Sequence, residues 1–335
     1  MWLLVETLSE VPTVVSEDDR ARNFRPLGTY LRTGVRVAAL KAVAAVQRSR
    51  RPVDVAITDG GVVRAVPVFG PSQRVHAVQL GIGESDLAMR PFAAAYEWIV
   101  GEPGKPLRSF WTDDFQRMYG LRQRRSIAAP FGLADVFQRV PGLAEVTKAM
   151  RGVYDPTPGD SFVNEFLARH DDGADHLIRS VRRVIATEGR IVIRGVDQDV
   201  TARLDPWEAT YAAVDHDALR LSLDRSDRYA AMLDLRHGGV MTWIGSRLPE
   251  VPRAVASGLE PFLHSDDVDR VRADVTAGRP VAIEVRLGLR HGWAPVAVQL
   301  DRMIGHGPTV VCLLIAAAAE CRGEETDDGP VLVAG

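Results

Sequence analysis

Cysteine is scarce in this sequence, which has only Cys312 and Cys321 among its 335 residues. Two cysteines cannot form the disulfide framework that holds small secreted proteins together. Their spacing does not match a metal-ligand pattern, and the eight histidines are scattered along the chain. We therefore expect a reducing, cytoplasmic location and no metal site.

The chain also has little net charge and no long apolar run. Its 41 basic and 44 acidic side chains give a formal charge of −3, which argues against a nucleic-acid or membrane partner held mainly by charge. The apolar run at 309–319 is about half the roughly 20 residues that a membrane helix needs. Residues 1–5 meet Glu6 at once, which does not fit a signal peptide. We expect no nucleic-acid partner and no membrane insertion.

The common catalytic motifs are missing as well. The sequence has no Gly-x-x-x-x-Gly-Lys-Ser/Thr loop, no His-Glu-x-x-His pair and no Gly-x-Ser-x-Gly turn. It also lacks the signature set of a kinase. We therefore predict that the chain is not an enzyme and carries no cofactor, with an enzyme of unrecognised type as the alternative.

What the sequence does contain is a repeat. Residues 51–57 and 279–285 both begin Arg-Pro-Val and continue as an apolar, strand-like run. Each copy follows a helix-like stretch and precedes two more strand-like runs. A fixed order of helix and three strands, met more than once, indicates tandem copies of one small module.

The last copy has the clearest pattern. Ser265 is expected to cap a helix whose buried positions include Val268, Val271 and Val275. Apolar and polar residues then alternate over 281–289 and 296–300, and glycine-containing turns separate these runs and lead to 309–315. This pattern predicts a helix followed by three antiparallel strands.

The rest of the chain follows the same order. In the first part, the spacing of Val37, Leu40, Val43 and Val46 predicts a helix with these residues on its apolar face. Alternating runs predict strands at 2–5, 12–15, 53–58, 62–69 and 75–80 in the first part and at 96–100, 162–169, 177–184 and 190–196 in the middle part, which also has a helix-like stretch at 143–150. We therefore predict an α+β fold with antiparallel sheets flanked by helices.

Three segments resemble parts of PAS sensor domains. Residues 110–120 are similar to the strand-to-helix passage near the start of a PAS domain, and residues 193–203 are similar to its end, where Asp199 and Thr201 form an Asp-x-Thr turn. His264-Ser265-Asp266-Asp267 resembles the His-Pro-Asp-Asp that opens a PAS helix, with serine in place of proline. The resemblance implies PAS-like units in the middle and at the end of the chain.

The first part is closer to GAF domains, which are structural relatives of PAS domains. Residues 65–69 and 75–80 look like the paired late strands of a GAF domain, and a degenerate PAS-like unit is the alternative. The resemblance implies three tandem units, similar to sensor-domain-only proteins of actinobacteria. The expected boundaries are 1–83 for the GAF-like unit, 84–203 and 204–320 for two PAS-like units, and 321–335 for an acidic flexible tail.

Aromatic side chains are the candidates for a ligand pocket, since such pockets have apolar walls with a few polar anchors. The alternative is that these rings simply fill the core of each unit. The candidates are Trp98, Trp111, Phe115, Tyr119, Trp243 and Trp293. Strand alternation also places Arg179 and Arg183 on one sheet face, where they could reach a protein partner or an acidic ligand.

Together these features predict a non-enzymatic sensor or scaffold protein of cytoplasmic signalling. A small-molecule ligand or a protein partner would shift the units at joints near Gly83 and Arg203, and a partner protein would supply the output in trans. The alternatives are a purely structural interaction module and an enzyme of unrecognised type.

Overall fold

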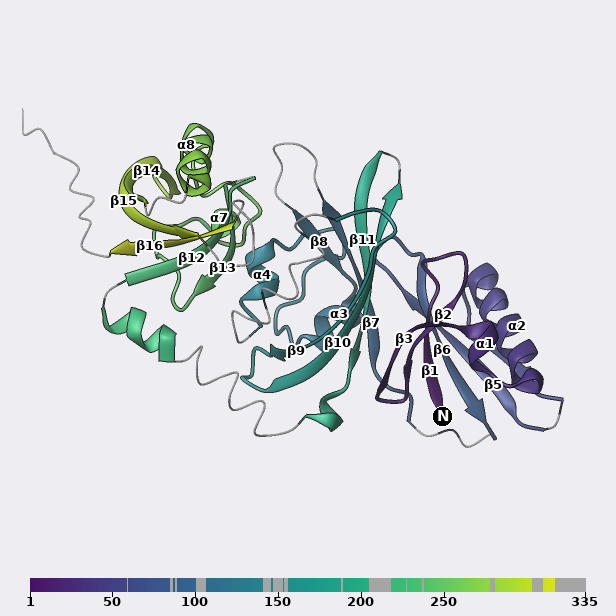
Figure 1. The fold of residues 1–335 in the computed structure, drawn as a ribbon. Coiled ribbons are helices and arrows are strands. Elements are labelled where there is room, and N and C mark those ends of the chain that lie inside the picture. Colours follow the sequence, from purple (N-terminus) through teal and green to yellow (C-terminus); the bar gives the residue numbers. More distant parts are fainter. Residues whose placement is uncertain are drawn as a thin grey trace, which may run out of the picture.

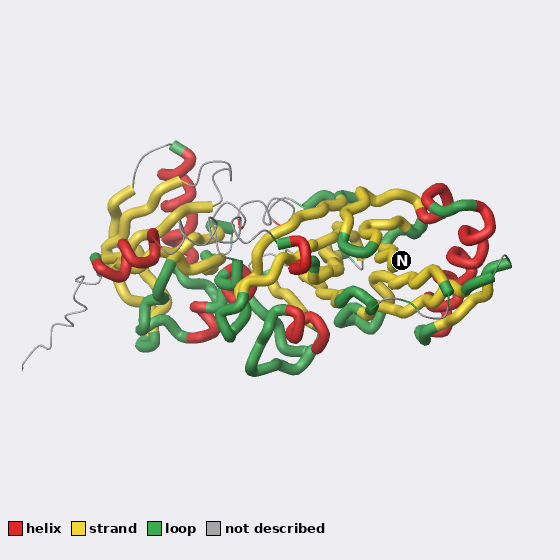
Figure 2. The backbone as a smooth tube through the Cα atoms, turned by 90° about the horizontal axis from the view of Figure 1, so that it is seen from below, coloured by secondary structure: helices red, strands yellow, loops and turns green. Residues whose placement is uncertain are grey.

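In the computed structural model, the chain forms three antiparallel sheets that lie in a row, with the second between the other two (Figures 1 and 2). The described residues are 1–58, 60–84, 87, 89–100, 107–140, 146, 153, 156–187, 189–204, 218–226, 228–236, 238–277, 281–302 and 310–316. The predictions for a helix at 143–150, for the first residues of the second repeat copy and for the tail at 321–335 fall largely or wholly outside them. No helix within the described residues has both the length and the apolar content to cross a membrane.

The three sheets share one strand order. The first consists of β1 (Trp2–Glu6), β2 (Thr13–Glu17), β3 (Arg20–Pro26), β4 (Val53–Ala56), β5 (Val62–Phe69) and β6 (Val75–Gly83), in the order β3-β2-β1-β6-β5-β4. The second consists of β7 (Ala93–Val100), β8 (Arg108–Trp111), β9 (Ser161–Arg169), β10 (Asp175–Thr187) and β11 (Arg190–Asp199), in the order β8-β7-β11-β10-β9. The third consists of β12 (Arg228–Asp234), β13 (Gly239–Ile244), β14 (Val281–Leu289), β15 (Gly292–Arg302) and β16 (Val310–Ala316), in the order β13-β12-β16-β15-β14. Apart from the extra edge strand β3, the first sheet therefore repeats the strand order of the other two.

The helices are few and mostly short. They are α1 (Leu27–Tyr30), α2 (Thr33–Ser49), α3 (Asp113–Met118), α4 (Leu133–Phe137), the 3-10 turn η1 (Thr201–Arg203), α7 (Arg253–Ala256) and α8 (Ser265–Thr276), with a further helical stretch at 218–225. In both copies of the repeat, the long helix leads into an edge strand, α2 into β4 and α8 into β14.

Helix α2 forms where the sequence predicts it, but its buried face is different. Val37 is 64% exposed and Leu40 is 38% exposed, whereas Ala38, Ala39 and Ala42 are buried against the first sheet. Small alanine side chains bring the helix close to the sheet, and alanine is the strongest helix former. The prediction that Val37 and Leu40 face the core is therefore wrong, although Val43 and Val46 are buried as predicted.

Helix α8 packs its valines on the third sheet as predicted, with Val268, Val271 and Val275 buried. Its N-cap is His264, whose Nδ1 accepts a hydrogen bond from the backbone N–H of Asp266 at 3.3 Å. The prediction of Ser265 as the cap is wrong by one residue, because the imidazole acceptor takes the place of a serine hydroxyl.

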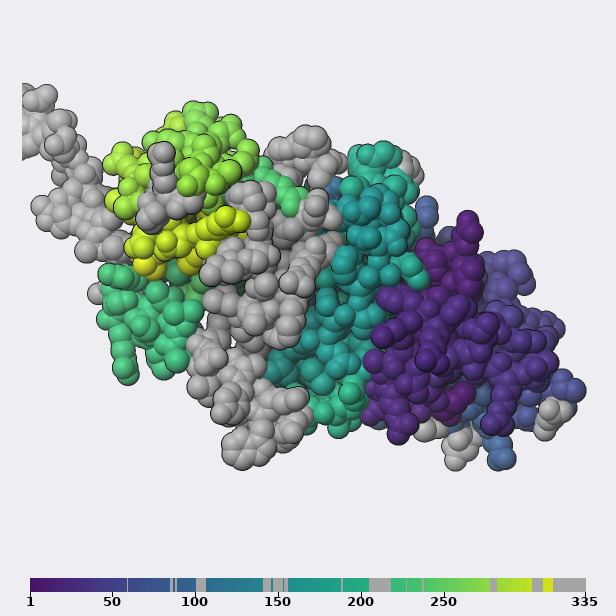
Figure 3. All heavy atoms as spheres, in the orientation of Figure 1, coloured from purple at the N-terminus to yellow at the C-terminus, as the bar shows by residue number. Residues whose placement is uncertain are grey.

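The first and second sheets pack face to face. Small side chains such as Ala77, Ala93 and Ala95 meet Val181 and Val196 in one buried cluster. Figure 3 shows the purple atoms of the first sheet directly against the teal atoms of the second. Small residues let the two backbones approach closely, so little water remains between them.

The second and third sheets meet through α4. Its residues Leu133 and Phe137 share a buried cluster with Met232 and Met241 of the third sheet. The backbone N–H of Ala134 donates to the carbonyl oxygen of Ser257 at 3.1 Å. Gly132 directly precedes α4, and a Cβ atom there would overlap the Ser257 carbonyl. Glycine is required at this position by the close approach of two backbones.

We expect Gly132→Ala to destabilise the chain by about 1–3 kcal/mol, because the added methyl group forces α4 away from the third sheet. Urea unfolding followed by circular dichroism measures this change. Gly28→Ala is the matched control, since a Cβ atom there meets nothing within 4 Å. Equal unfolding midpoints for the two variants would contradict the close contact.

Candidate functional site

Four of the six predicted aromatic residues come together on one face of the second sheet. Trp111 contacts Phe115 and Tyr119, with ring centroids 4.9 and 5.2 Å apart. Phe115 stacks on Tyr119 at 4.7 Å, and Trp98 meets Phe137 of α4 edge to face at 6.0 Å. We call this region the aromatic chamber, defined by Tyr96, Trp98, Trp111, Phe115, Tyr119, Phe137, Ser180, Arg182 and Asp197.

Local sequence explains how α3 brings two of these rings into the chamber. The Thr112 hydroxyl accepts a hydrogen bond from the backbone N–H of Phe115 at 3.1 Å, which starts the helix directly after β8. Asp113 and Asp114 follow in the first turn, where the helix dipole favours carboxylates. Phe115 and Tyr119 are four residues apart and therefore lie on the same side of the helix.

The rings fill most of the chamber. The remaining cavity has a volume of about 20 Å³, which is enough for about one water molecule. A small-molecule ligand would therefore have to displace a side chain to enter. In this state the four aromatic residues serve chiefly as core, which was the alternative that the sequence left open.

A buried polar group lies beside the rings. The Tyr119 hydroxyl donates to Asp197 Oδ2 at 2.7 Å, and the hydroxyls of Tyr96 and Ser180 lie 3.0 Å apart. The second carboxylate oxygen of Asp197, Oδ1, is buried with no hydrogen-bond partner among the described residues. A buried carboxylate oxygen without a partner is costly, which makes this carboxyl a candidate functional group.

Burial changes the acidity of this group. It raises the pKa of Asp197 from 3.8 to about 7, although hydrogen bonds from Ser180 and Tyr119 and the charge of Arg182 act in the opposite direction. Burial and the nearby Asp197 carboxylate likewise raise the pKa of the Tyr119 hydroxyl. Asp197 is thus the chamber residue whose charge changes near neutral pH.

Sequence reasoning missed Tyr96, Ser180, Arg182 and Asp197. Strand alternation could have indicated Ser180 and Arg182, because they alternate with Arg179, Val181 and Arg183 along β10 and therefore lie on the opposite face of the sheet. A serine, an arginine and an aspartate at buried, inward-facing positions are unusual.

Arg179 and Arg183 contact the first sheet of the same chain. The Arg179 side chain is fully buried; it donates to Ser16 Oγ at 3.1 Å, to the Asp19 carbonyl at 2.8 Å and to Glu165 Oε1. Arg183 donates to Glu6 Oε2 at 2.9 Å. The acidic groups that these arginines reach in this structure are therefore internal.

The two remaining tryptophans lie in the third sheet and do not join the chamber. Trp243 is buried, and its indole N–H donates to the Ala256 carbonyl at 3.0 Å. Trp293 is 47% exposed and contacts His264 edge to face at 5.0 Å. Among the described residues, no three His, Cys, Asp or Glu side chains are grouped as a metal site would require.

Comparison with known proteins finds one family model that matches part of the chain. Residues 1–91 match the family model described as Rv3651-like, N-terminal. A crystal structure of an uncharacterised protein from Mycobacterium tuberculosis aligns with a TM-score of 0.72 at 21% identity, over 93% of this chain and 94% of that one. This alignment shows a shared fold. No curated protein matches the sequence.

Structures of sensor proteins are more distant. A sensory box histidine kinase/response regulator from Burkholderia thailandensis has a TM-score of 0.24 at 19% identity, covering 40% of this chain and 90% of that one. An RNA-binding light-oxygen-voltage receptor has a TM-score of 0.25 at 10% identity, covering 66% and 94%. These scores are too low to support an argument about function.

We expect Asp197→Asn to remove a pH dependence of stability. The pKa of Asp197 is raised in the folded chain. The stability that this carboxyl contributes is therefore fully present below its unfolded-state pKa of about 4 and is lost as pH rises toward 7. Between pH 4 and 7, wild type should therefore lose stability relative to the variant, by an amount on the order of a few kcal/mol. Urea unfolding of both proteins at steps from pH 4.5 to 8 measures the difference.

Asp114→Asn is the control for this experiment, because its carboxylate is half exposed and lies outside the chamber. Its stability difference from wild type should stay nearly constant over the same range. A constant difference for Asp197→Asn as well would show that this carboxyl titrates near its ordinary pKa.

Proposed function

We propose that the chain is a non-enzymatic sensor or scaffold protein of the cytoplasm, built from three tandem sensor-like units. In this proposal the second sheet couples its chamber to the first sheet, and a partner protein supplies the output. The observation that carries the proposal is that β10 and β11 are buried on both faces, with the chamber on one side and the first sheet on the other.

Strand β10 has alternating contacts. Ser180 and Arg182 line the chamber. Arg179 and Arg183, between and beside them, bond to Ser16 and Glu6 of the first sheet. A displacement of this strand at the chamber therefore also moves the groups that hold the first sheet.

Strand β11 repeats this arrangement. Asp197 faces the chamber, and a Cβ atom at Gly195 would overlap the Tyr96 ring, so the ring lies directly on the strand. On the other face, the Gln198 side-chain amide donates to the Asp18 carbonyl at 2.7 Å. The His76 ring of the first sheet lies 3.3 Å from the Gly195 carbonyl oxygen.

A signal at the chamber would act through these strands. Ionisation of Asp197, or entry of a small ligand in place of a ring, changes the packing on one face of β10 and β11. The change reaches the first sheet only if the altered chamber favours a different arrangement of the first and second sheets. A protein partner that distinguishes these arrangements would then read the signal.

The second candidate function is a purely structural interaction module. The small chamber volume of about 20 Å³ favours it, since a filled chamber has no room for a ligand without rearrangement. The two functions differ in whether a change inside the chamber reaches the first sheet.

Hydrogen exchange of the first sheet tests this difference. We expect Phe115→Leu, which loosens the chamber, to increase amide exchange in β1, β2 and β6. Phe262→Leu in the third sheet is the matched control, because Phe262 is equally a core residue but packs on Trp243, away from β10 and β11. Leucine keeps an apolar side chain in place of the ring and removes only part of the buried volume, so both variants should fold.

An increase in first-sheet exchange for Phe115→Leu alone would support the sensor. Unchanged exchange in the first sheet for both variants would favour the structural module. Equal increases for both would indicate general destabilisation and contradict coupling through β10 and β11.

A further inference from the structure

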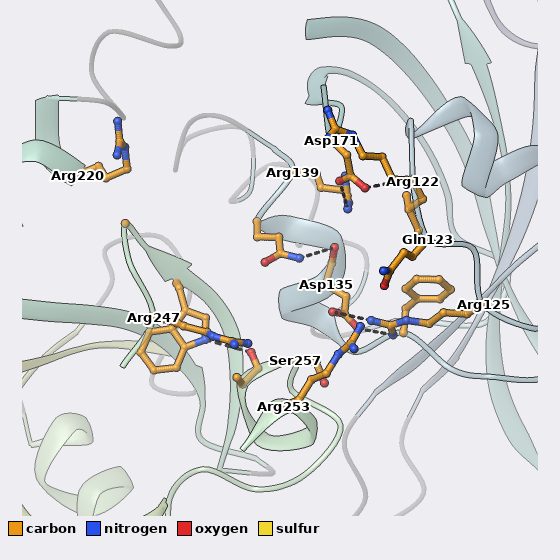
Figure 4. Close-up of a pocket in the computed structure, with 16 residues that line it drawn as sticks. Arg122, Gln123, Arg125, Asp135, Arg139, Asp171, Arg220, Arg247, Arg253 and Ser257 are labelled. Atoms are coloured by element: carbon orange, nitrogen blue, oxygen red, sulfur yellow. Dashed lines mark hydrogen bonds and ion pairs between the residues drawn. The ribbon is translucent and has the colours of Figure 1, made fainter. Parts of the chain in front are cut away.

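A separate cleft lies between the second and third sheets, beside α4. Its volume is about 860 Å³, within the range of ligand pockets in proteins. Figure 4 shows that one wall comes from the second sheet and its loops, with Arg122, Arg125 and Arg139, and the other wall from the third sheet, with Arg247 and Arg253.

The cleft is strongly basic in a chain whose net charge is −3. Among the described residues that line it, six are arginines and two, Asp135 and Asp171, are acidic. The six arginines are Arg122, Arg125, Arg139, Arg220, Arg247 and Arg253. Because this local charge is opposite to the overall charge, the arginines are concentrated here rather than spread evenly over the surface.

Both carboxylates already pair with arginines of the cleft. Asp135 accepts two hydrogen bonds from Arg125, at 2.8 and 3.3 Å, and Asp171 pairs with Arg139 at 2.7 Å. Arg125 also lies over the Phe131 ring, 4.4 Å from its centroid. These contacts fix two guanidinium groups in place, so they are preorganised for a ligand.

Three other arginines, Arg122, Arg247 and Arg253, are exposed and form no side-chain ion pair among the described residues. The backbone N–H of Arg122 donates to Asp171 Oδ2 at 2.8 Å, and the charge of Arg122 helps to lower the pKa of Asp171. Arg122 comes from the second sheet's side of the cleft and the other two from the third sheet's side (Figure 4). Their charges are therefore available to an anion that reaches across the cleft.

The arrangement selects the kind of anion. Arginine forks bind phosphate and carboxylate through paired hydrogen bonds. Each phosphate monoester contributes about −1.5 to −2 at neutral pH, so two phosphate groups match the charges of Arg122, Arg247 and Arg253. Arg220 is not counted among them, because it pairs with Asp224 at 3.7 Å. We propose that this cleft binds a small organic polyphosphate, which bridges the second and third sheets.

A small polyphosphate fits better than an acidic protein segment. The free arginines converge on one hollow of ligand size instead of forming a long stripe, so the charge is suited to a compact anion. The proposal does not depend on the aromatic chamber, because the cleft and the chamber share no titratable residue.

Isothermal titration calorimetry of the full chain with ATP and with inorganic tripolyphosphate tests the proposal. We expect saturable binding of one molecule per chain, weakened by added salt, and much weaker binding of inorganic phosphate, which cannot span both walls. The double variant Arg247→Gln/Arg253→Gln should lose at least tenfold in affinity for ATP. Both residues are exposed, so the variant should unfold at the wild-type urea concentration.

Arg51→Gln/Arg74→Gln is the matched control, since it removes the same charge at exposed positions of the first sheet's side of the molecule. Its affinity for ATP should equal that of wild type. Equal losses in the two double variants would overturn the proposal, as would the absence of saturable binding of both ATP and tripolyphosphate. Binding of a poly-glutamate peptide without binding of tripolyphosphate would likewise overturn it, in favour of an acidic protein partner.

Discussion

The burial of β10 and β11 on both faces is the constraint on which the rest of the structure depends. Polar side chains on such a strand are costly to bury unless they are hydrogen-bonded. Arg179 is fully buried, and its charge is held by Glu165 and by groups of the first sheet. A buried guanidinium without these partners would cost several kcal/mol. The first sheet can therefore dock in only the arrangement that places Ser16 and the Asp19 carbonyl against Arg179.

The sequence predicted the helices and strands better than it predicted what packs against each of their faces. Period-two alternation located most strands of the first two sheets and β14, β15 and β16 of the third, but it missed β3, β12 and β13. The Arg-Pro-Val repeat indicated a common module. Alternation does not say what covers each face, however. Arg179 and Arg183 were expected to face a partner or an acidic ligand, and they face another part of the same chain. The wrong prediction for Val37 and Leu40 has the same cause. The spacing of apolar residues alone did not reveal that the alanines of α2 would pack closest to the sheet.

The candidate site was predicted in part. Trp98, Trp111, Phe115 and Tyr119 were recognisable as a group, because they lie close together in sequence and aromatic rings are seldom left exposed. Asp197 was not recognisable, since its partners Tyr119 and Ser180 come from other elements. The basic cleft was equally hidden. Its arginines are spread from residue 122 to residue 253, and only the packing of α4 against the third sheet brings them together.

The two junctions of the molecule differ in physical character. The first and second sheets are joined by small apolar side chains and by directional bonds from buried charged groups, which define one arrangement. The second and third sheets are joined around α4 by apolar packing and a backbone hydrogen bond, and beside this contact the cleft remains open. Arginines line both walls, and like charges disfavour a closer approach of the walls. A bound polyanion would reverse this repulsion and draw the walls together. The junction with the third sheet is therefore the one whose geometry an anionic ligand is best placed to change.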